Sequence, residues 1–262
     1  KLSLKVVSSN GKDTVKLKVV HGGQLHSFKG INLPNTKITL PCLTRKDRKD
    51  LAFILTQKIE WIGLSFVRSS EDIKKLKRII KRAKVTHKVI AKIEKPQAIK
   101  ELDAIINESE AIMVARGDLG VEVPTQKVPA YQKSIVEKCI LASKPVVIAT
   151  QMLESMTKNP RATRAEVNDV ANSVIDGADA VMLSGETSVG QYPLKAVDTM
   201  RKIIRDVEKS KHSISKNQPL REITNKERLL SEAICSSACS IAETANAKAI
   251  IAITYSGYNA IK

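Results

Sequence analysis

The sequence has few aromatic residues and no long apolar run. Only 3% of its 262 residues are aromatic, so Ile, Val, Leu and Ala have to form most of the core. No stretch of about 18 consecutive apolar residues exists, and this excludes a membrane-spanning helix of the usual kind. The first residues, Lys1 to Lys5, alternate polar and apolar side chains, so they predict a strand and no signal peptide.

Cysteine is also scarce. Cys42, Cys139, Cys235 and Cys239 are too few and too scattered for a disulfide framework. Cys235 and Cys239 lie one helical turn apart, but no nearby histidine or second cysteine pair completes a zinc site. We therefore expect reduced, buried thiols in an intracellular protein.

Acidic residues are outnumbered, with 27 Asp+Glu against 44 Lys+Arg and a formal net charge of +17. Such a charge often indicates a nucleic-acid or membrane partner. However, the densest basic run, residues 74–84, is interleaved with Leu76 and Ile80 at helical spacing, which is typical of an amphipathic helix with a solvated face. Aromatic residues for base stacking are missing from this run. We expect no nucleic acid and no membrane as partners, and interpret the charge as attraction for phosphorylated metabolites.

The hydrophobic period divides the chain into three regions. Residues 1–33 alternate with period two, and Asn10-Gly11 offers a tight hairpin turn, which predicts an antiparallel β piece with one solvated face. The middle region, 34–208, alternates helical and strand patterns. A polar linker (209–224), a helix (227–245) and a strand (249–253) then indicate the start of another α/β domain.

Five strand–helix units fill the middle region. The expected strands are Trp61–Val67, Val89–Ile93, Ala111–Val114, Pro145–Ala149 and Ala180–Leu183. This repetition predicts parallel strands joined by crossover helices. A closed (β/α)8 barrel needs eight units, so the sheet is either open or lacks three units at its start. The β piece before the first strand favours the second alternative, an α/β chain that holds part of a TIM-type barrel.

Polar residues follow the apolar runs, at the strand ends where parallel α/β folds bind ligands. Lys92 and Glu94 are two residues apart on one strand and so point to the same side. Asp118, after the next strand, adds a second carboxylate, and two carboxylates with substrate oxygens are a usual way to hold Mg²⁺. Gly117 allows close approach of the backbone, and the run from Arg116 to Gly120 offers N–H groups to an anion.

Each of these residues also has a purely structural interpretation. Lys92 and Glu94 could form a buried ion pair, while Thr150 and Ser184 could be turn residues after their strands. Their common position at one rim, together with Asp118, favours contacts with a substrate.

The stretches that hold these residues resemble pyruvate kinase. They run in family order over nearly the whole chain: Lys29–Pro34, Ser65–Arg68, Ala91–Glu94, Ile112–Gly120, Ala149–Met156, Asn159–Glu166 and Met182–Thr187. Together they are highly specific, although one alone would not be. The resemblance implies transfer of the phosphoryl group of phosphoenolpyruvate to ADP, giving pyruvate and ATP in glycolysis.

The resemblance also implies roles in the chemistry. Glu94 and Asp118 would bind Mg²⁺ (or Mn²⁺), and Lys92 would lie against the transferring phosphoryl group and the enolate oxygen. Ser184 would serve the proton relay to the enolate carbon. Phosphoryl transfer depends on fixed positive charge and alignment, which a lysine and a metal ion supply.

Binding roles follow in the same way. The backbone of Gly117 and Asp118, with Thr150, would hold the substrate carboxylate, and Lys29 would reach the nucleotide phosphates. Residues 1–33 would be a remnant of the β lid domain, 34–208 the partial catalytic barrel, and 209–262 a linker and the start of the C-terminal α/β regulatory domain.

The chain also departs from the family pattern. The first three barrel strands, which carry an arginine, an asparagine and the K⁺ ligands, have no counterpart, so we expect an incomplete, inactive portion with the K⁺ ligands outside it. Ala162 replaces a usual proline, and the segment after Glu94 lacks a common asparagine. The parent enzyme is expected to be a cytoplasmic homotetramer, or alternatively a plastid or other organellar isoform.

Three other functions remain open at this point. A magnesium-dependent aldolase or lyase acting on pyruvate would share the carboxylates but need no nucleotide. Lys92 could form a Schiff base, although flanking carboxylates favour its ammonium form. The chain could also be an inactive assembly or binding module.

Overall fold

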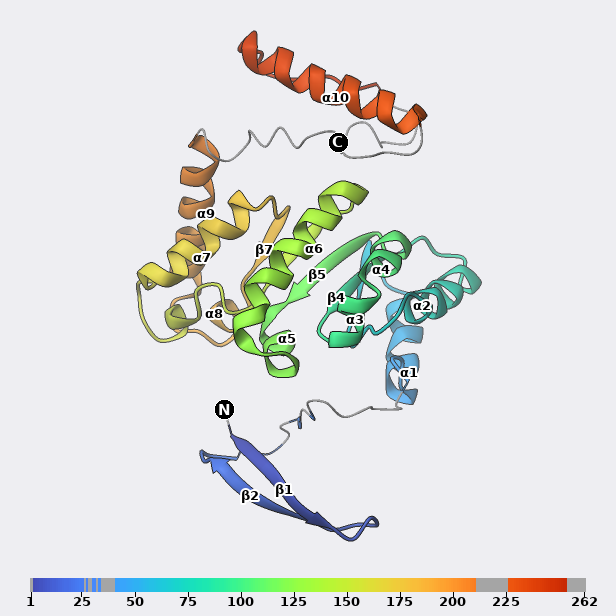
Figure 1. Ribbon diagram of the computed structural model, residues 1–262, viewed down its shortest axis with the longest axis vertical. Coiled ribbons are helices and arrows are strands. Elements are labelled where there is room, and N and C mark those ends of the chain that lie inside the picture. The colour runs from blue at the N-terminus through green and yellow to red at the C-terminus, as the bar shows by residue number, and fades with distance from the viewer. Residues whose placement is uncertain are drawn as a thin grey trace. The chain divides into compact units, whose positions relative to one another are not determined.

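The computed structural model describes residues 2–25, 27, 30, 31, 33, 41–210 and 226–253. The chain divides into two compact units, Lys1–Thr36 and Lys37–Lys262. Figure 1 shows the helices and strands of both. None of the described helices has the length and apolar character that crossing a bilayer needs.

The first unit is an antiparallel hairpin of β1 (Ser3–Ser9) and β2 (Val15–His21). Its loop is held by Asn10, whose N–H donates to the Thr14 carbonyl and whose Oδ1 accepts the N–H groups of residues 12, 13 and 14. The hairpin is confirmed, but its loop is longer than the tight turn that Asn10-Gly11 predicts. Every residue of both strands is exposed, so the described hairpin shows two solvated faces instead of the expected one.

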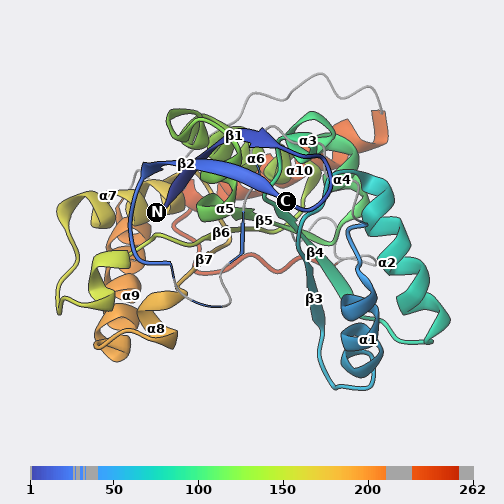
Figure 2. The same cartoon turned by 90° about the horizontal axis from the view of Figure 1, so that it is seen from below.

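The second unit is built on one parallel sheet with the strand order β3-β4-β5-β6-β7. These strands are Trp61–Leu64, Lys88–Ile93, Ala111–Ala115, Val146–Ala149 and Ala180–Met182. Figure 2 shows the sheet curving from β3 to β7 with helices on its outer side. Among the described residues β3 and β7 do not pair with each other, so the predicted partial barrel is confirmed and is open.

The helices of this unit follow the strands in the predicted alternation. They are α1 (Arg45–Ile54), α2 (Ser70–Arg82), α3 (Pro96–Lys100), α4 (Leu102–Glu108), α5 (Arg116–Glu122), α6 (Val128–Ala142), α7 (Arg164–Ile175), α8 (Gly185–Ser188) and α9 (Pro193–Lys209). Two 3₁₀ turns, η1 (Thr125–Lys127) and η2 (Glu154–Thr157), lie between them. The last described helix is α10 (Lys226–Thr244).

The basic helix α2 shows how the sequence specifies this outer layer. Ile73, Leu76 and Ile80 are buried, whereas Lys74 and Lys75 are exposed. A helix that repeats apolar residues every three to four positions buries one stripe and leaves the opposite face in water. The interpretation of the basic run as a solvated helix face is confirmed.

The sheet buries mainly the face that the helices cover. On β4, Val89, Ala91 and Ile93 are fully buried in the core shared with the helices, whereas Ile90 and Lys92 on the opposite face are half-buried. Parallel sheets are ordinarily covered on both faces. The concave face of the described sheet therefore carries Lys92 without a full apolar cover.

Two predicted strands have to be corrected. The first was expected to reach Val67, but β3 ends at Leu64 because the backbone turns at Phe66, whose φ is 56°. Residues 249–253 were expected to form a strand and are not one, because no described segment pairs with them. The helix predicted before them is confirmed as α10.

The cysteines only partly match the expectation of buried thiols. None of the four cysteines, all within the described ranges, forms a disulfide; Cys139 is buried, but Cys239 is exposed, so the prediction is wrong for Cys239. Burial raises the pKa of the Cys139 thiol to about 12, and mainly for the same reason the pKa of Cys42 also rises to about 12. Both thiols are therefore protonated at neutral pH.

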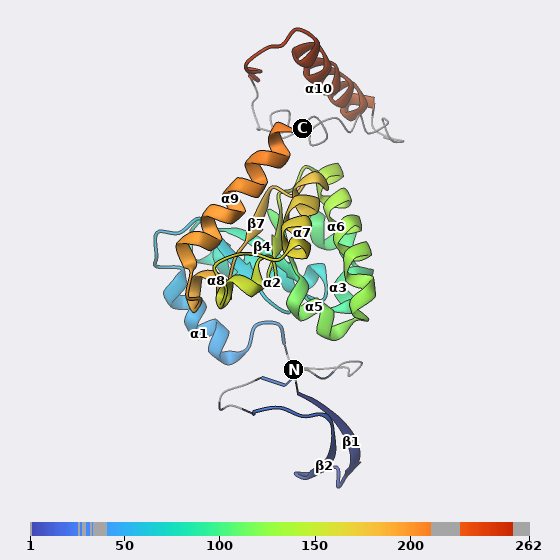
Figure 3. The ribbon, with the colours of Figure 1, turned by 90° about the vertical axis from the view of Figure 1, so that its left-hand side faces the viewer.

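A carboxylate at the start of α7 ties this helix to the 3₁₀ turn η2. Glu166 accepts hydrogen bonds from the N–H and Oγ of Ser155 (2.7 and 2.6 Å) and from the N–H and Oγ1 of Thr163 (2.8 and 2.9 Å). Burial alone would raise the pKa of Glu166, but these hydrogen bonds outweigh it and hold the pKa below its ordinary value of 4.5. Because α7 packs against α9 (Figure 3), Glu166 joins η2 to this pair of helices.

We expect Glu166→Gln to lower the free energy of unfolding by about 1–2 kcal/mol at pH 7, because a neutral amide cannot accept all four hydrogen bonds. The folded-state pKa is depressed, so the stabilisation is complete above pH 4.5 and disappears as the pH falls through the lower folded value. Urea unfolding at neutral and acidic pH measures this. Glu154→Gln, an exposed neighbour on η2, is the control and should change nothing; equal effects of both variants would contradict the assignment.

Candidate active site

The strand ends gather at one edge of the parallel sheet, and Lys92 is paired there. Its Nζ donates a hydrogen bond to Ser65 Oγ (2.9 Å), just beyond β3, and forms an ion pair with Glu94 Oε1 (2.7 Å). Lys92 and Glu94 therefore lie on the same side of β4, as their spacing predicts.

The Glu94 carboxylate is almost fully buried, with 2% of its surface exposed. Its second oxygen, Oε2, accepts the N–H of Phe66 at 3.0 Å. A buried carboxylate is stable only where hydrogen bonds and an opposite charge offset its lost hydration. The left-handed turn at Phe66 (φ 56°) brings its N–H into that position, so the early end of β3 serves the site.

Asp118 lies in the first turn of α5, directly after β5. β5 is the neighbour of β4 in the sheet, with Val114 opposite Ile93, so the two carboxylates follow adjacent strand ends. In contrast to Glu94, Asp118 is exposed, and no hydrogen bond or ion pair joins its carboxylate to the rest of the described chain.

Glu94 and Asp118 supply carboxylates, the kind of side chain that a magnesium ion ordinarily binds. Mg²⁺ typically takes one or two protein carboxylates and completes its shell with water and substrate oxygens. Within the described ranges no group of three or more His, Cys, Asp or Glu side chains is arranged to hold a metal, so a site here needs ligands from a substrate. Both oxygens of Glu94 already have partners, Lys92 and the Phe66 N–H, whereas the Asp118 carboxylate is open to solvent.

Gly117 and Thr150, both predicted to contact the substrate carboxylate, contact each other. The N–H of Gly117 donates to Thr150 Oγ1 at 3.0 Å. A Cβ at position 117 would lie 3.0 Å from the same oxygen, which is tighter than an ordinary van der Waals contact, so this close approach favours glycine. The sequence places both residues near one ligand but gives no sign that they bond each other.

Ser184 follows β7 and is half-buried. Its N–H donates to Glu186 Oε2 (2.9 Å), and Glu186 Oε1 accepts the N–H of Leu153 (3.1 Å). Glu186 is buried and thus connects the ends of β6 and β7. This role of Glu186 was not predicted from the sequence, where its only signal is an acidic residue two positions after the predicted strand-end serine.

A second ion pair connects β4 to α5. Lys95 Nζ lies 2.6 Å from Glu122 Oε1, and both side chains are largely shielded from solvent. Lys95 also lies over the Phe66 ring, 5.6 Å from its centroid. The segment after Glu94, where the sequence departs from the family pattern, therefore holds the helix that carries Gly117 and Asp118.

The remaining predicted residue, Lys29, lies outside the described residues. The described chain thus brings Lys92 into contact with Glu94, and Gly117 into contact with Thr150. It places Asp118 after β5 and Ser184 after β7, at the same edge of the sheet but without such a direct contact.

Comparison with known proteins shows the family of the chain. The family model for the pyruvate kinase barrel domain matches residues 1–197. A pyruvate kinase of Mycobacterium tuberculosis is 47% identical over 257 residues, covering 98% of this chain and 53% of the relative, and that of Candida albicans is 41% identical over 259 residues, covering 99% and 51%. Pyruvate kinase 1 of Trypanosoma brucei brucei is 42% identical over 259 residues, covering 99% and 52%.

The chain spans about half the length of the curated relatives that it matches. The family match covers most of the chain, including the five described strands and every strand-end residue discussed above. This chain therefore belongs to the pyruvate kinase barrel-domain family.

Proposed function

We propose that the complete natural protein carrying this chain is a pyruvate kinase, which transfers the phosphoryl group of phosphoenolpyruvate to ADP. The observation that carries the proposal is the position of Lys92, whose ammonium group lies between Ser65 Oγ and the buried Glu94 carboxylate at the strand ends of a chain of this family. A fixed cation at such an edge stabilises negative charge on a phosphoryl group and on an enolate.

Each residue of the candidate site then has a separate role. Lys92 is the positive charge nearest the transferring group and is kept in place by Glu94 and Ser65. Thr150 and the backbone at Gly117 and Asp118 bind the carboxylate of the substrate. Ser184 is the candidate to pass a proton to the enolate carbon, since its hydroxyl makes no hydrogen bond within the described chain.

We further propose that the enzyme depends on Mg²⁺ (or Mn²⁺), with Glu94 and Asp118 as its protein ligands. A bound divalent cation would neutralise charge on the phosphoryl and enolate oxygens. ADP binding by Lys29, dependence on K⁺, a tetrameric assembly and a cytoplasmic location remain predictions.

The test is the formation of ATP and pyruvate by the complete natural protein from phosphoenolpyruvate, ADP and Mg²⁺. We expect turnover that disappears when ADP or the divalent cation is left out. Release of pyruvate without ADP would indicate a lyase or aldolase instead, and trapping of pyruvate on Lys92 by borohydride would indicate a Schiff base. Either result, or no reaction in the presence of all components, would overturn the proposed function.

A further inference from the structure

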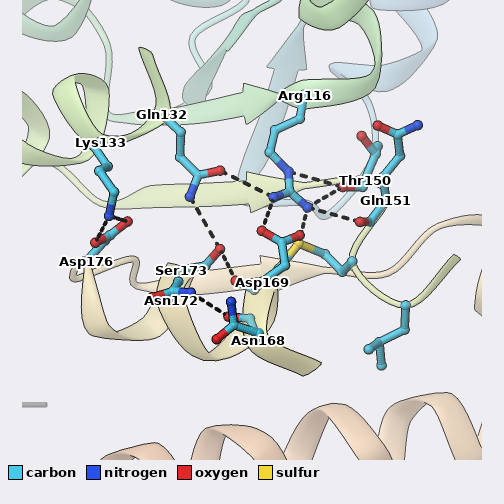
Figure 4. Close-up of polar contacts among 12 residues, drawn as sticks. Arg116, Gln132, Lys133, Thr150, Gln151, Asn168, Asp169, Asn172, Ser173 and Asp176 are labelled. Atoms are coloured by element: carbon cyan, nitrogen blue, oxygen red, sulfur yellow. Dashed lines mark hydrogen bonds and ion pairs between the residues drawn. The ribbon is translucent and has the colours of Figure 1, made fainter. Parts of the chain in front are cut away.

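The guanidinium group of Arg116 is surrounded by acceptors at the entrance of α5 (Figure 4). Nη2 donates to the carbonyls of Thr150 (2.9 Å) and Gln151 (3.2 Å), and Nε donates to the Thr150 carbonyl at 3.3 Å. Nη1 donates to Asp169 Oδ1 at 2.8 Å and to Gln132 Oε1 at 3.4 Å, and Nη2 also lies 2.7 Å from Met152 Sδ. Only 10% of the Arg116 side chain is exposed.

These contacts use the whole hydrogen-bonding capacity of the side chain. Arginine has five N–H donors in a rigid planar fork, and all three of its nitrogens donate to described acceptors. An arginine next to a predicted phosphate-transfer site is ordinarily expected to bind an anion directly. The N–H groups of Arg116 instead donate to acceptors within the protein, which leaves none of its three nitrogens available for a direct contact with the substrate.

The segment that Arg116 holds has a strained backbone. Thr150 has a φ of 70° and Gln151 a φ of 55°, which is the left-handed region that residues with a Cβ rarely adopt. Such strain persists only where surrounding contacts hold it, and it concentrates at functional sites. Arg116 donates to the carbonyls of both strained residues.

Thr150 is therefore held at two points by consecutive residues of the chain. Arg116 fixes its carbonyl oxygen, and the N–H of Gly117 fixes its hydroxyl. The turn thereby sets where Thr150 Oγ1 lies relative to the strand-end carboxylates. A small rotation of the peptide between residues 150 and 151 would move that hydroxyl.

Arg116 is in turn fixed from the outer helices. Asp169 on α7 pairs with its guanidinium, and Gln132 on α6 accepts from the same nitrogen. Ser173 completes the network, since its Oγ accepts from Gln132 Nε2 (3.4 Å) and donates to the Asp169 carbonyl (3.0 Å). The arrangement links the outer layer to the strand end of β6 (Figure 4).

We propose that Arg116 is a positioning residue that holds the strained Thr150–Gln151 turn in its binding geometry and does not itself touch the substrate. The inference rests on the proposed function, because it assigns Thr150 to the carboxylate of phosphoenolpyruvate. Holding the turn requires the planar, forked guanidinium group of Arg116 and its ion pair with Asp169. A positive charge at position 116 without this shape is not sufficient.

Arg116→Lys tests this distinction in the complete natural protein. Lysine keeps the charge but lacks the fork, so we expect the KM for phosphoenolpyruvate to rise about 10–100-fold with little change in the KM for ADP. If Arg116 bound the substrate as a charge, lysine would retain most of the affinity. Asp169→Asn should shift the same KM in the same direction.

The matched control is Asp176→Asn. Asp176 caps the C-terminal end of α7 and also pairs with a cation, Lys133 of α6, at 2.6 Å, but it does not contact residues 150–152 (Figure 4). We expect its KM values to equal those of the unsubstituted protein. An effect as large as that of Asp169→Asn would show general loosening of α7 and would overturn the proposal.

A double-mutant cycle with Thr150→Val shows whether Arg116 acts through Thr150. Valine keeps the branched shape and removes the hydroxyl. Arg116→Lys is expected to raise the KM for phosphoenolpyruvate by no more than about twofold further in the Thr150→Val background, since coupled sites are not additive. If the rise in KM of the double variant equals the product of the rises caused by Arg116→Lys and by Thr150→Val alone, the proposal is overturned.

Hydrogen exchange gives a readout that does not need turnover. The peptide containing residues 150–153 should exchange about tenfold faster in Arg116→Lys and Asp169→Asn than in Asp176→Asn. Unchanged exchange in Arg116→Lys would overturn the inference even if the enzyme is active. Absence of turnover in the unsubstituted protein, with the exchange difference present, would overturn the proposed function and the substrate role of Thr150 while supporting the positioning of the turn by Arg116.

Discussion

Lys92→Met in the complete natural protein is expected to lower the turnover of phosphoenolpyruvate by about 10²–10⁴-fold, the range found when a fixed donor or cation is removed from a charged transition state. The Lys92 ammonium group is a fixed positive charge at the strand ends, between Ser65 Oγ and Glu94 Oε1. Methionine matches its length but supplies no charge. The loss should therefore appear in kcat as well as in kcat/KM.

The same substitution should not weaken the binding of a divalent cation. Removing Lys92 frees Glu94 Oε1 from its ion pair, so Mn²⁺ binding, measured by electron paramagnetic resonance, is expected to stay the same or tighten. The unpaired buried carboxylate should also cost stability in the metal-free protein. A Mn²⁺ titration of thermal unfolding would then show a larger stabilisation by metal in the variant than in the unsubstituted protein.

Lys88→Met is the matched control for this prediction. Lys88 lies on the same strand, and its ammonium group contacts the Trp61 ring at 5.1 Å instead of a carboxylate. Removing it subtracts the same charge from the opposite end of β4, and turnover should change by less than about threefold. Turnover that survives Lys92→Met nearly intact, or falls equally in both variants, would show that Lys92 has no specific role.

Periodicity alone predicted the elements that position this site. A short apolar run between two helical patterns marked β4, and the spacing of two residues placed Lys92 and Glu94 on one side of it; their 2.7 Å ion pair confirms this. Apolar residues at helical spacing marked α2 in the same way. Such patterns can be recognised in the sequence because each helix or strand has to turn its apolar residues toward the same core.

Contacts between distant segments could not be predicted in this way. The left-handed turn at Phe66 has no glycine or asparagine to announce it, and it exists because the Glu94 carboxylate accepts the Phe66 N–H. Helix α5 was missed because Gly117 and Gly120 lower the helix propensity of its sequence. The bond from Arg116 to the Thr150 carbonyl joins segments that are neighbours only once β5 and β6 pair.

Asp118→Asn separates metal binding from folding more cleanly than any change at Glu94. Asp118 is exposed and bonds to no other described side chain, so its amide should leave the free energy of unfolding within about 0.5 kcal/mol of the original value. Glu94 is buried and paired with Lys92, so Glu94→Gln is expected to lower stability as well. Both variants should lose turnover if both carboxylates hold the cation.

Changing a residue that only hydrogen-bonds to a metal ligand typically lowers metal affinity by roughly 10–100-fold. Asp118→Asn replaces a direct anionic ligand by a neutral amide, so we expect its Mn²⁺ affinity to fall by more than this. Asp206→Asn, which removes the same charge from an exposed position on α9, is the control and should bind Mn²⁺ like the unsubstituted protein. Titration of Mn²⁺ by electron paramagnetic resonance compares the three variants and the unsubstituted protein under one condition. If Asp118→Asn and Glu94→Gln both bind the ion as tightly as the control, the two strand-end carboxylates do not share a cation. The positive charge that phosphoryl transfer requires would then have to come from Lys92 and from residues outside the described chain.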